Sequence, residues 1–242
     1  MGVGKERIES NLRRIQDQIA AACARSGRAT SEVTLVAVTK SGDGDDIRHL
    51  VELGVAELAE SRAQQLTQRA EELAPWLAQP PGGAAVRWHM VGHLQRNKVR
   101  QVLEFSQIIH SVDSLRLAEE INSRCERMGR QADILLEVNC SQEPQKFGCA
   151  VVAVPHLAEL VCTFQHIRLV GLMTMAPLAD DPEAARPSFV RLRELFDEMR
   201  HHHVGGSGLA HLSMGMSHDF PIAIEEGATM LRIGTALFEN AP

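Results

Sequence analysis

A lysine follows an apolar run early in the chain and could act as a nucleophile. Lys40 closes the run VTLVAVTK, residues 33–40, which reads as a buried strand with an amine at its carboxyl end. Such a lysine can form a Schiff base with an aldehyde. The apolar residues before it would desolvate the amine and favour the neutral form that attacks a carbonyl. The pattern predicts carbonyl chemistry at Lys40, and a solvated surface charge is the competing interpretation.

The other end of the chain carries groups suited to phosphate. Ser217 lies in a turn just before a helix-like stretch from about Asp219 to Glu226, and a helix N-terminus with hydroxyls readily binds phosphate. The neighbouring candidates are Ser213, Gly215, Arg232, Gly234 and Thr235. An aldehyde that also bears a phosphate would suit both ends of the chain, which points to pyridoxal 5'-phosphate. The competing interpretation is that Ser217 only caps a helix and Gly234 only permits a turn.

Strand-like segments alternate with helical patterns along the whole chain. The predicted strands are Val33–Lys40, Val55–Ala59, Val86–Val91, Ile108–Val112, Ile134–Cys140, Leu169–Met173, Leu209–Ser213 and Thr229–Ile233. Eight such units in 242 residues predict an α/β protein with a single (β/α)8 TIM-type barrel, residues 1–242 forming one domain. A doubly wound open sheet is the alternative. Sites in these barrels gather at the carboxyl ends of the strands, where Lys40 would lie.

Further segments complete the expected architecture. Ile8, Leu12, Ile15 and Ile19 recur at helical spacing, so residues 1–30 should form an amphipathic helix that packs on the barrel. Pro75 to Ala85 and Pro177 to Pro182 read as loops that are too short to link domains.

Composition limits the possible locations and partners. The net charge of −6 gives no long-range attraction for nucleic acid or an anionic membrane. No apolar run approaches the roughly 18 residues that would span a bilayer. Five scattered cysteines without a CxxC pair suit a reducing compartment, so we expect a cytoplasmic protein. His201 to His203 are consecutive, point in different directions on a helix, and predict no metal site.

Several motifs carry a family resemblance. They are VAVTK at 36–40, WHMVGHLQRNK at 88–98, VNCSQEPQKFG at 138–148, GLMTM at 171–175 and the closing SMGMSHDFPIAIEEGATMLRIGTALF. Together they resemble the pyridoxal phosphate homeostasis proteins, also called the YggS/PROSC family, over nearly the whole chain. The resemblance implies the barrel of the N-terminal domain of alanine racemases, with the cofactor bound as an internal aldimine.

The resemblance also implies roles for particular residues. Lys40 would be the Schiff-base lysine, and Arg232 would face the pyridine nitrogen. An arginine cannot surrender a proton there, so the ring nitrogen would stay neutral and the cofactor would be a weaker electron sink. The remaining expected cofactor-binding residues are Ser217, Gly234 and Thr235 at the phosphate and His89 at the barrel mouth.

The chain departs from the family pattern in places. Ala59, Glu60 and Ser61 stand where the family has a GEN-type motif, which puts in doubt any role for an asparagine there. Glu239 replaces the usual glycine after the final phenylalanine. Lys146 matches a lysine implicated in a second binding mode in some relatives, and an exposed loop lysine is the competing interpretation.

Racemisation needs acid and base groups on both faces of the cofactor. Fold-related alanine racemases use a tyrosine from a second domain on one face, and this chain contains no tyrosine. We therefore expect a monomeric binding protein that holds pyridoxal 5'-phosphate for vitamin B6 homeostasis and passes it to apo enzymes. The alternatives are a slow racemase or lyase with the same cofactor, and an aldolase-like barrel that uses Lys40 alone.

Overall fold

The structure is a computed structural model that describes residues 2–78 and 85–239. Within these residues, eight parallel strands form a closed barrel in sequence order, and β8 pairs back onto β1. The strands are β1 Thr34–Val38, β2 Glu57–Glu60, β3 Arg87–Met90, β4 Ser106–Val112, β5 Ala132–Glu137, β6 Ile167–Met173, β7 His211–Ser213 and β8 Met230–Ile233. The predicted barrel is confirmed, and the open sheet is excluded because each of these eight strands pairs with a strand on both sides, so that β8 closes the ring onto β1.

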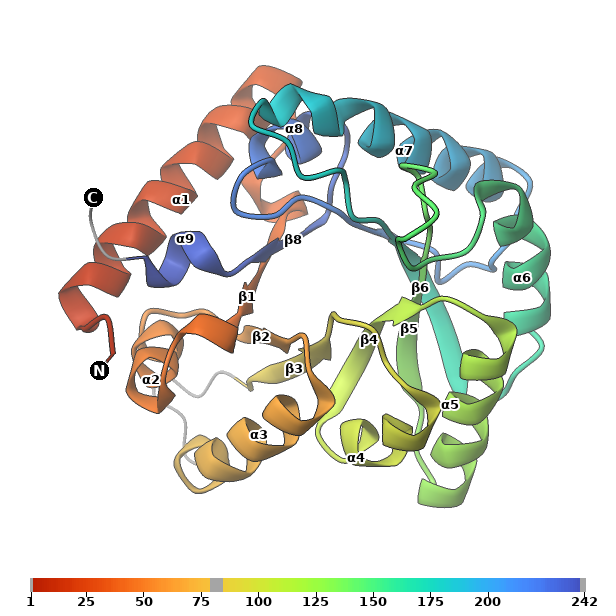
Figure 1. Ribbon diagram of the computed structural model, residues 1–242, viewed down its shortest axis with the longest axis horizontal. Helices are drawn as coiled ribbons and strands as arrows, with labels where there is room; N and C mark the ends of the chain where they lie inside the picture. Colours follow the sequence, from red (N-terminus) through yellow and green to blue (C-terminus); the bar gives the residue numbers. More distant parts are fainter. Residues whose placement is uncertain (1, 79–84, 240–242) are drawn as a thin grey trace.

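Helices surround the strands, as Figure 1 shows. They are α1 Lys5–Ser26, α2 Gly44–Glu52, α3 Ala63–Leu77, α4 Val99–Leu103, α5 Leu115–Met128, α6 Val154–Val161, α7 Arg186–His201, α8 Phe220–Glu225 and α9 Thr235–Phe238. The predicted amphipathic helix is α1, which buries its apolar stripe against α8 and α9. Asn11 on its buried face donates a hydrogen bond to the Leu237 carbonyl at 3.0 Å, which joins the two ends of the chain.

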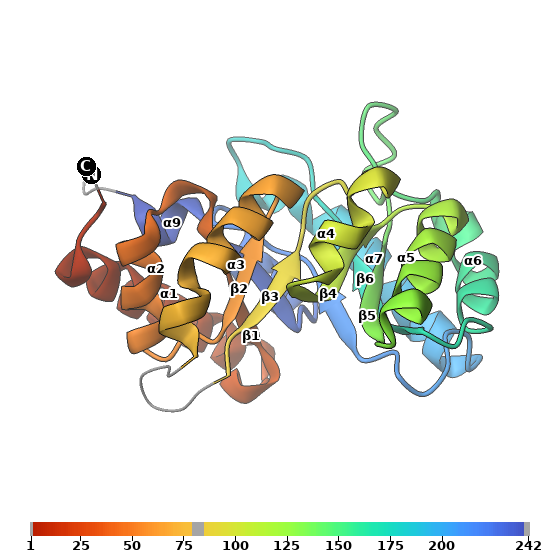
Figure 2. The same ribbon diagram turned by 90° about the horizontal axis from the view of Figure 1, so that it is seen from below.

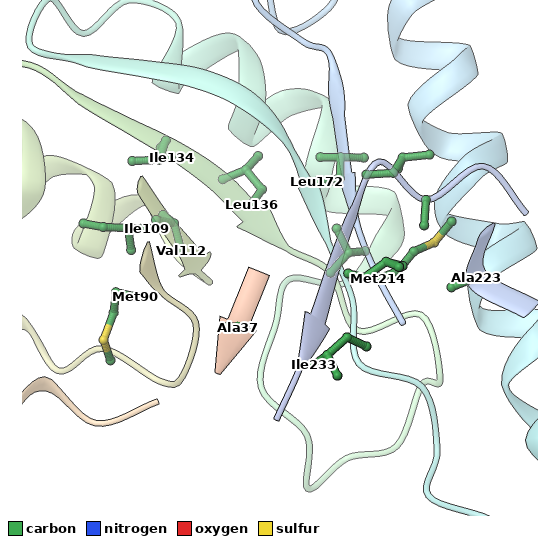
Figure 3. Packing of buried hydrophobic residues seen from close by; sticks show 14 of the residues in the cluster. Ala37, Met90, Ile109, Val112, Ile134, Leu136, Leu172, Met214, Ala223 and Ile233 are labelled. Carbon is green, nitrogen blue, oxygen red and sulfur yellow. The ribbon is translucent and has the colours of Figure 1, made fainter. Parts of the chain in front are cut away.

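Successive strand residues point alternately outward and inward. The outward residues form one large core with the helices, and Figure 3 shows part of it, from Met90 and Ile109 on the strands to Met214 after β7 and Ala223 of α8. The inside of the barrel holds two small apolar clusters: Val36, Val38, Ala59, Val91 and Met230 form one, and Ile108, Leu135, Val170 and Met173 form the other. Buried polar side chains are also present inside the barrel, and they matter for the site.

All eight strands differ from the expected bounds by one to three residues at one or both ends, and two differences from the expected elements matter here. α3 continues through Pro75 to Leu77, so the start of the predicted loop Pro75 to Ala85 is helical, and residues 79–84 lie outside the described part. Pro75 has no N–H group to donate and its ring crowds the carbonyl of Glu71, and the helix ends two residues later at Leu77. β1 ends at Val38, and Lys40 lies in a 3-10 turn, Thr39–Ser41, because the Gly42 amide donates back to the Thr39 carbonyl.

Gly171 permits the close approach of β6 and β7. It pairs with His211, and a Cβ atom at residue 171 would lie 2.2 Å from the His211 carbonyl oxygen. Overpacking of this kind costs about 1–3 kcal/mol, so we expect Gly171→Ala to lower the free energy of unfolding by at least that amount in denaturant titrations.

Gly44→Ala is the matched control. A Cβ atom there would meet only the flexible carboxylate of Glu72 at 2.6 Å, and Gly44 is a helical position of α2. Equal stability of the two alanine variants would contradict the role of close strand contact at Gly171.

Candidate functional site

The predicted site residues other than His89 surround one end of the barrel. Figure 2 shows the loops after β5 and β6 rising from this end, where the strands have their carboxyl termini. We call this end the mouth. Lys40 follows β1 by two residues, while Ser217 lies in the loop after β7 and Gly234 directly follows β8.

Lys40 is exposed, although the sequence led us to expect a desolvated amine. Val36, Ala37 and Val38 of β1 are buried, but the turn at Thr39–Ser41 carries the lysine side chain out of that environment. The expectation that apolar residues desolvate the amine is therefore wrong, and the amine is open to incoming ligands.

The predicted phosphate-binding residues come together at the junction of β8 and β1. Ser217 Oγ accepts a hydrogen bond from the Ala236 amide at 3.2 Å, so Ser217 caps α9 and not the helix that follows it in sequence. Gly234 is buried, and a Cβ atom there would lie 3.2 Å from the Val38 carbonyl oxygen, two residues before Lys40. Thr235 is exposed at the start of α9. Three distant segments thus meet beside the lysine.

A cavity of about 750 Å³ opens beside these residues. Ser217 and Thr235 line it, together with Arg14 of α1 and Leu178 of the loop after β6. Hydroxyl groups and a helix start on one wall suit an oxyanion.

Arg232 is a buried cation on β8. Its Nη1 donates to Ser213 Oγ at 2.7 Å, and its Nη2 donates to the Thr174 carbonyl at 2.8 Å. Burial lowers its pKa to about 10, against the opposing effect of the carboxylates of Asp219 and Glu137. The guanidinium is therefore charged at neutral pH. Ser213 serves as its acceptor inside the barrel and not as part of the phosphate turn.

His89 does not lie where the sequence placed it. It is fully buried inside the barrel, with Nδ1 at 2.8 Å from His110 Nε2 and Nε2 at 2.6 Å from Glu57 Oε2. The expectation that His89 contacts a ligand at the mouth is wrong, because its inward position on β3 leaves both ring nitrogens engaged within the barrel. Sequence reasoning missed His110, since nothing local indicates its partner.

Glu137 is a site residue that the sequence analysis also missed. It ends β5, is 4% exposed, and its Oε2 has no hydrogen-bond partner among the described residues. Burial raises its pKa to about 7, although Arg232 acts in the opposite direction. An acidic residue at the end of the apolar run ILLE was the available signal.

The raised pKa of Glu137 predicts a pH-dependent stability. A folded pKa of about 7, above the usual value of 4.5, favours the protonated carboxyl in the folded protein. The resulting stabilisation is complete below about pH 4.5 and is lost as the pH rises through 7. Relative to that of Glu137→Gln, the free energy of unfolding of the wild type should fall by about 3 kcal/mol between pH 4.5 and 8. Denaturant titrations of both proteins across this range measure the difference, and parallel pH profiles would contradict it.

Glu60, within the departure Ala59-Glu60-Ser61, supports the neighbour of Lys40. Its Oε1 accepts from Thr39 Oγ1 at 2.6 Å and pairs with Arg69 Nε of α3 at 2.8 Å. The carboxylate therefore lies between the barrel and α3 and holds the turn that carries the lysine. Lys146, in the loop after β5, is partly buried and pairs with Glu143, so it is not the fully exposed loop lysine of the competing interpretation.

The described residues form neither a metal-binding cluster nor a membrane-spanning helix. Neither 2–78 nor 85–239 holds three or more metal-ligating side chains grouped around a possible ion. Over the same ranges, no helix combines the length and the apolar character required to cross a membrane.

Comparisons with known proteins agree with this architecture. Residues 5–242 match the family model described as alanine racemase, N-terminal domain. The pyridoxal phosphate homeostasis protein of Aquifex aeolicus is 37% identical over 227 residues, which cover 94% of this chain and 95% of that protein.

Two solved structures are similar over nearly their whole length. A structure described as an unknown protein from Bifidobacterium adolescentis has a TM-score of 0.91 and 36% identity, covering 97% of this chain and 95% of its own. PipY of Synechococcus elongatus, solved with pyridoxal phosphate bound, has a TM-score of 0.78 and 32% identity, covering 93% of this chain and all of its own. The chain described here therefore belongs to the pyridoxal phosphate homeostasis family, within the proteins that share the N-terminal domain of alanine racemases.

Proposed function

We propose that this protein binds pyridoxal 5'-phosphate at the mouth through the amine of Lys40 and serves as a cytoplasmic reserve of the cofactor. The observation that carries the proposal is the convergence of Lys40, Ser217 and Arg232 on one end of the barrel from three distant segments. The family membership and the bound cofactor of PipY support the same ligand.

The residues present suit this ligand. Ser217 and Thr235 offer hydroxyls beside the start of α9, and a hydroxyl can donate a hydrogen bond to a phosphate oxygen. When bound, pyridoxal 5'-phosphate supplies an aldehyde carbon that a primary amine attacks with loss of water. Lys40 is the exposed amine two residues beyond β1, and Gly234 keeps the neighbouring backbone close.

Arg232 would set the properties of the ring nitrogen. Two of the five N–H donors of its guanidinium bind Ser213 and Thr174, which hold the group in place. Because its pKa is about 10, it stays protonated at neutral pH and would donate to the ring nitrogen without transferring a proton. An unprotonated ring stabilises carbanions weakly, which favours storage over amino acid chemistry.

An enzymatic role is the second candidate, and Glu137 is the observation that favours it. A nearly buried carboxyl with a pKa of about 7 at the mouth could exchange protons with a bound amino acid. Against this role, the chain has no tyrosine, the residue that alanine racemases use for the second face.

One experiment separates the two roles. The protein is loaded with pyridoxal 5'-phosphate, its visible spectrum is recorded, and L-alanine and D-alanine are each incubated with it in deuterated water. A reserve protein should show the coloured adduct and exchange the α-proton no faster than free cofactor. Sustained exchange well above free cofactor would establish the enzyme, while a colourless protein after loading would reject both.

A further inference from the structure

A row of buried polar side chains crosses the inside of the barrel. Arg232 Nη1 donates to Ser213 Oγ at 2.7 Å, and Ser213 Oγ lies 2.8 Å from His110 Nδ1. His110 Nε2 lies 2.8 Å from His89 Nδ1, and His89 Nε2 lies 2.6 Å from Glu57 Oε2. We call these five residues the polar row. Its three middle members are 0% exposed, and it runs from the mouth to the first residue of β2 at the opposite end.

The chemistry of the two ends determines where the protons lie. A guanidinium can only donate, so Ser213 Oγ accepts from Arg232 and its own hydrogen is free to point at His110 Nδ1. His110 then carries its proton on Nε2 and donates to His89. A carboxylate can only accept, so His89 carries a proton on Nε2 and donates to Glu57. Both ends lead to one arrangement, with two neutral imidazoles in the Nε2–H tautomer.

The electrostatics of the row agree with this arrangement. Burial lowers the pKa of His110 well below its usual value, and the nearby cation of Arg232 adds to the effect, so the ring is neutral. Burial raises the pKa of Glu57, but hydrogen bonds from His89 and from Arg87 outweigh it, and Glu57 is a carboxylate.

We propose that Glu57, His89 and His110 are positioning residues for the bound cofactor, because through Ser213 they hold Arg232 as a donor at the mouth. Ser213 Oγ can accept a hydrogen bond from Arg232 while its own hydrogen is donated to His110 Nδ1. The direction of that second hydrogen bond depends on the Glu57 carboxylate at the other end of the polar row. The inference rests on the proposed function, since it concerns the arginine expected to meet the pyridine nitrogen. A charge at the amino-terminal end of the barrel thereby influences binding at the carboxyl-terminal end.

The proton arrangement can be measured without any cofactor. Long-range proton–nitrogen spectra of labelled apo protein distinguish the tautomers of its 11 histidines, once they are assigned through the backbone. We expect the Nε2–H pattern for both His89 and His110 at pH 7. A ring in the Nδ1–H or doubly protonated form at either position would overturn the inference.

The influence on binding needs a matched pair of variants. Glu57→Gln removes the anchoring charge of the row, which also pairs with Arg87 Nε at 2.9 Å. Asp133→Asn removes a similar carboxylate near the start of β5, which pairs with Arg168 Nε at 2.7 Å outside the row. We expect Glu57→Gln to weaken pyridoxal 5'-phosphate binding about 2- to 30-fold, the range typical of coupling through contiguous networks, and to shift the visible band.

The control variant decides what the loss means. Asp133→Asn should leave affinity and band unchanged, and equal effects of the two variants would overturn the inference while the proposed function stands. Should the wild type fail to bind pyridoxal 5'-phosphate, the proposed function fails, and the tautomers of the apo protein still decide the arrangement of the row. Glu57→Asp, which keeps the carboxylate, should recover part of the affinity that Glu57→Gln loses, and no recovery would count against a charge-based anchor.

Discussion

Lys40→Ala should abolish the covalent capture of pyridoxal 5'-phosphate and the colour that accompanies it. Lys40 is the exposed amine at the mouth, and an alanine leaves no nucleophile at that position. The chain has only three other lysines, Lys5, Lys98 and Lys146. After reduction with borohydride, peptide mapping of the wild type should place the label on Lys40, and the variant should carry no label at the mouth.

Lys98→Ala is the control for the loss of a lysine. Lys98 belongs to the 3-10 turn Arg96–Lys98, and its removal should leave the colour and the reduced adduct unchanged. A Lys40→Ala protein that keeps a visible band resistant to acid would reject Lys40 as the amine that captures the cofactor. A reduced label found on Lys146 would place the capturing amine in the loop after β5.

Arg232→Met should destabilise the folded protein by about 3–5 kcal/mol, because removing one partner of a buried charged network leaves the others uncompensated. Methionine keeps the apolar stem but provides no donor for Ser213 Oγ or the Thr174 carbonyl. Glu137 would also lose a nearby cation that favours its charged form. Denaturant titration at pH 8 measures the loss, and the same variant should bind pyridoxal 5'-phosphate more weakly.

Two further variants test the cause of this loss. Arg232→Lys keeps the charge without the planar fork, so it should retain part of the stability but bind the cofactor less well than the wild type. Glu137→Gln in the Arg232→Met background should restore part of the stability, because it removes the carboxylate left without its cation. Wild-type stability in Arg232→Met would show that the buried guanidinium is not needed for the fold.

The sequence predicted the parts of the site that depend on local patterns. Lys40 follows an apolar strand, and Ser217 and Gly234 border short helices, so hydrophobic periodicity and turn chemistry indicated their place at the strand ends. Their convergence then followed from the rule that parallel strands of one barrel share a carboxyl end. The exposure of Lys40 did not follow, because it depends on how the chain turns after β1.

The sequence alone thus determined the barrel and the strand ends at which Lys40, Ser217 and Gly234 lie, since alternation and spacing are properties of neighbouring residues. Only the tertiary structure decided that His89 lies inside the barrel and that His110 and Ser213 connect it to Arg232. It also decided that Oε2 of Glu137 is buried without a hydrogen-bond partner in the part of the chain that the structure describes. The contact between His110 and Ser213 joins residues 103 positions apart. Such contacts depend on the register of strands around the closed barrel, which no local pattern of residues specifies.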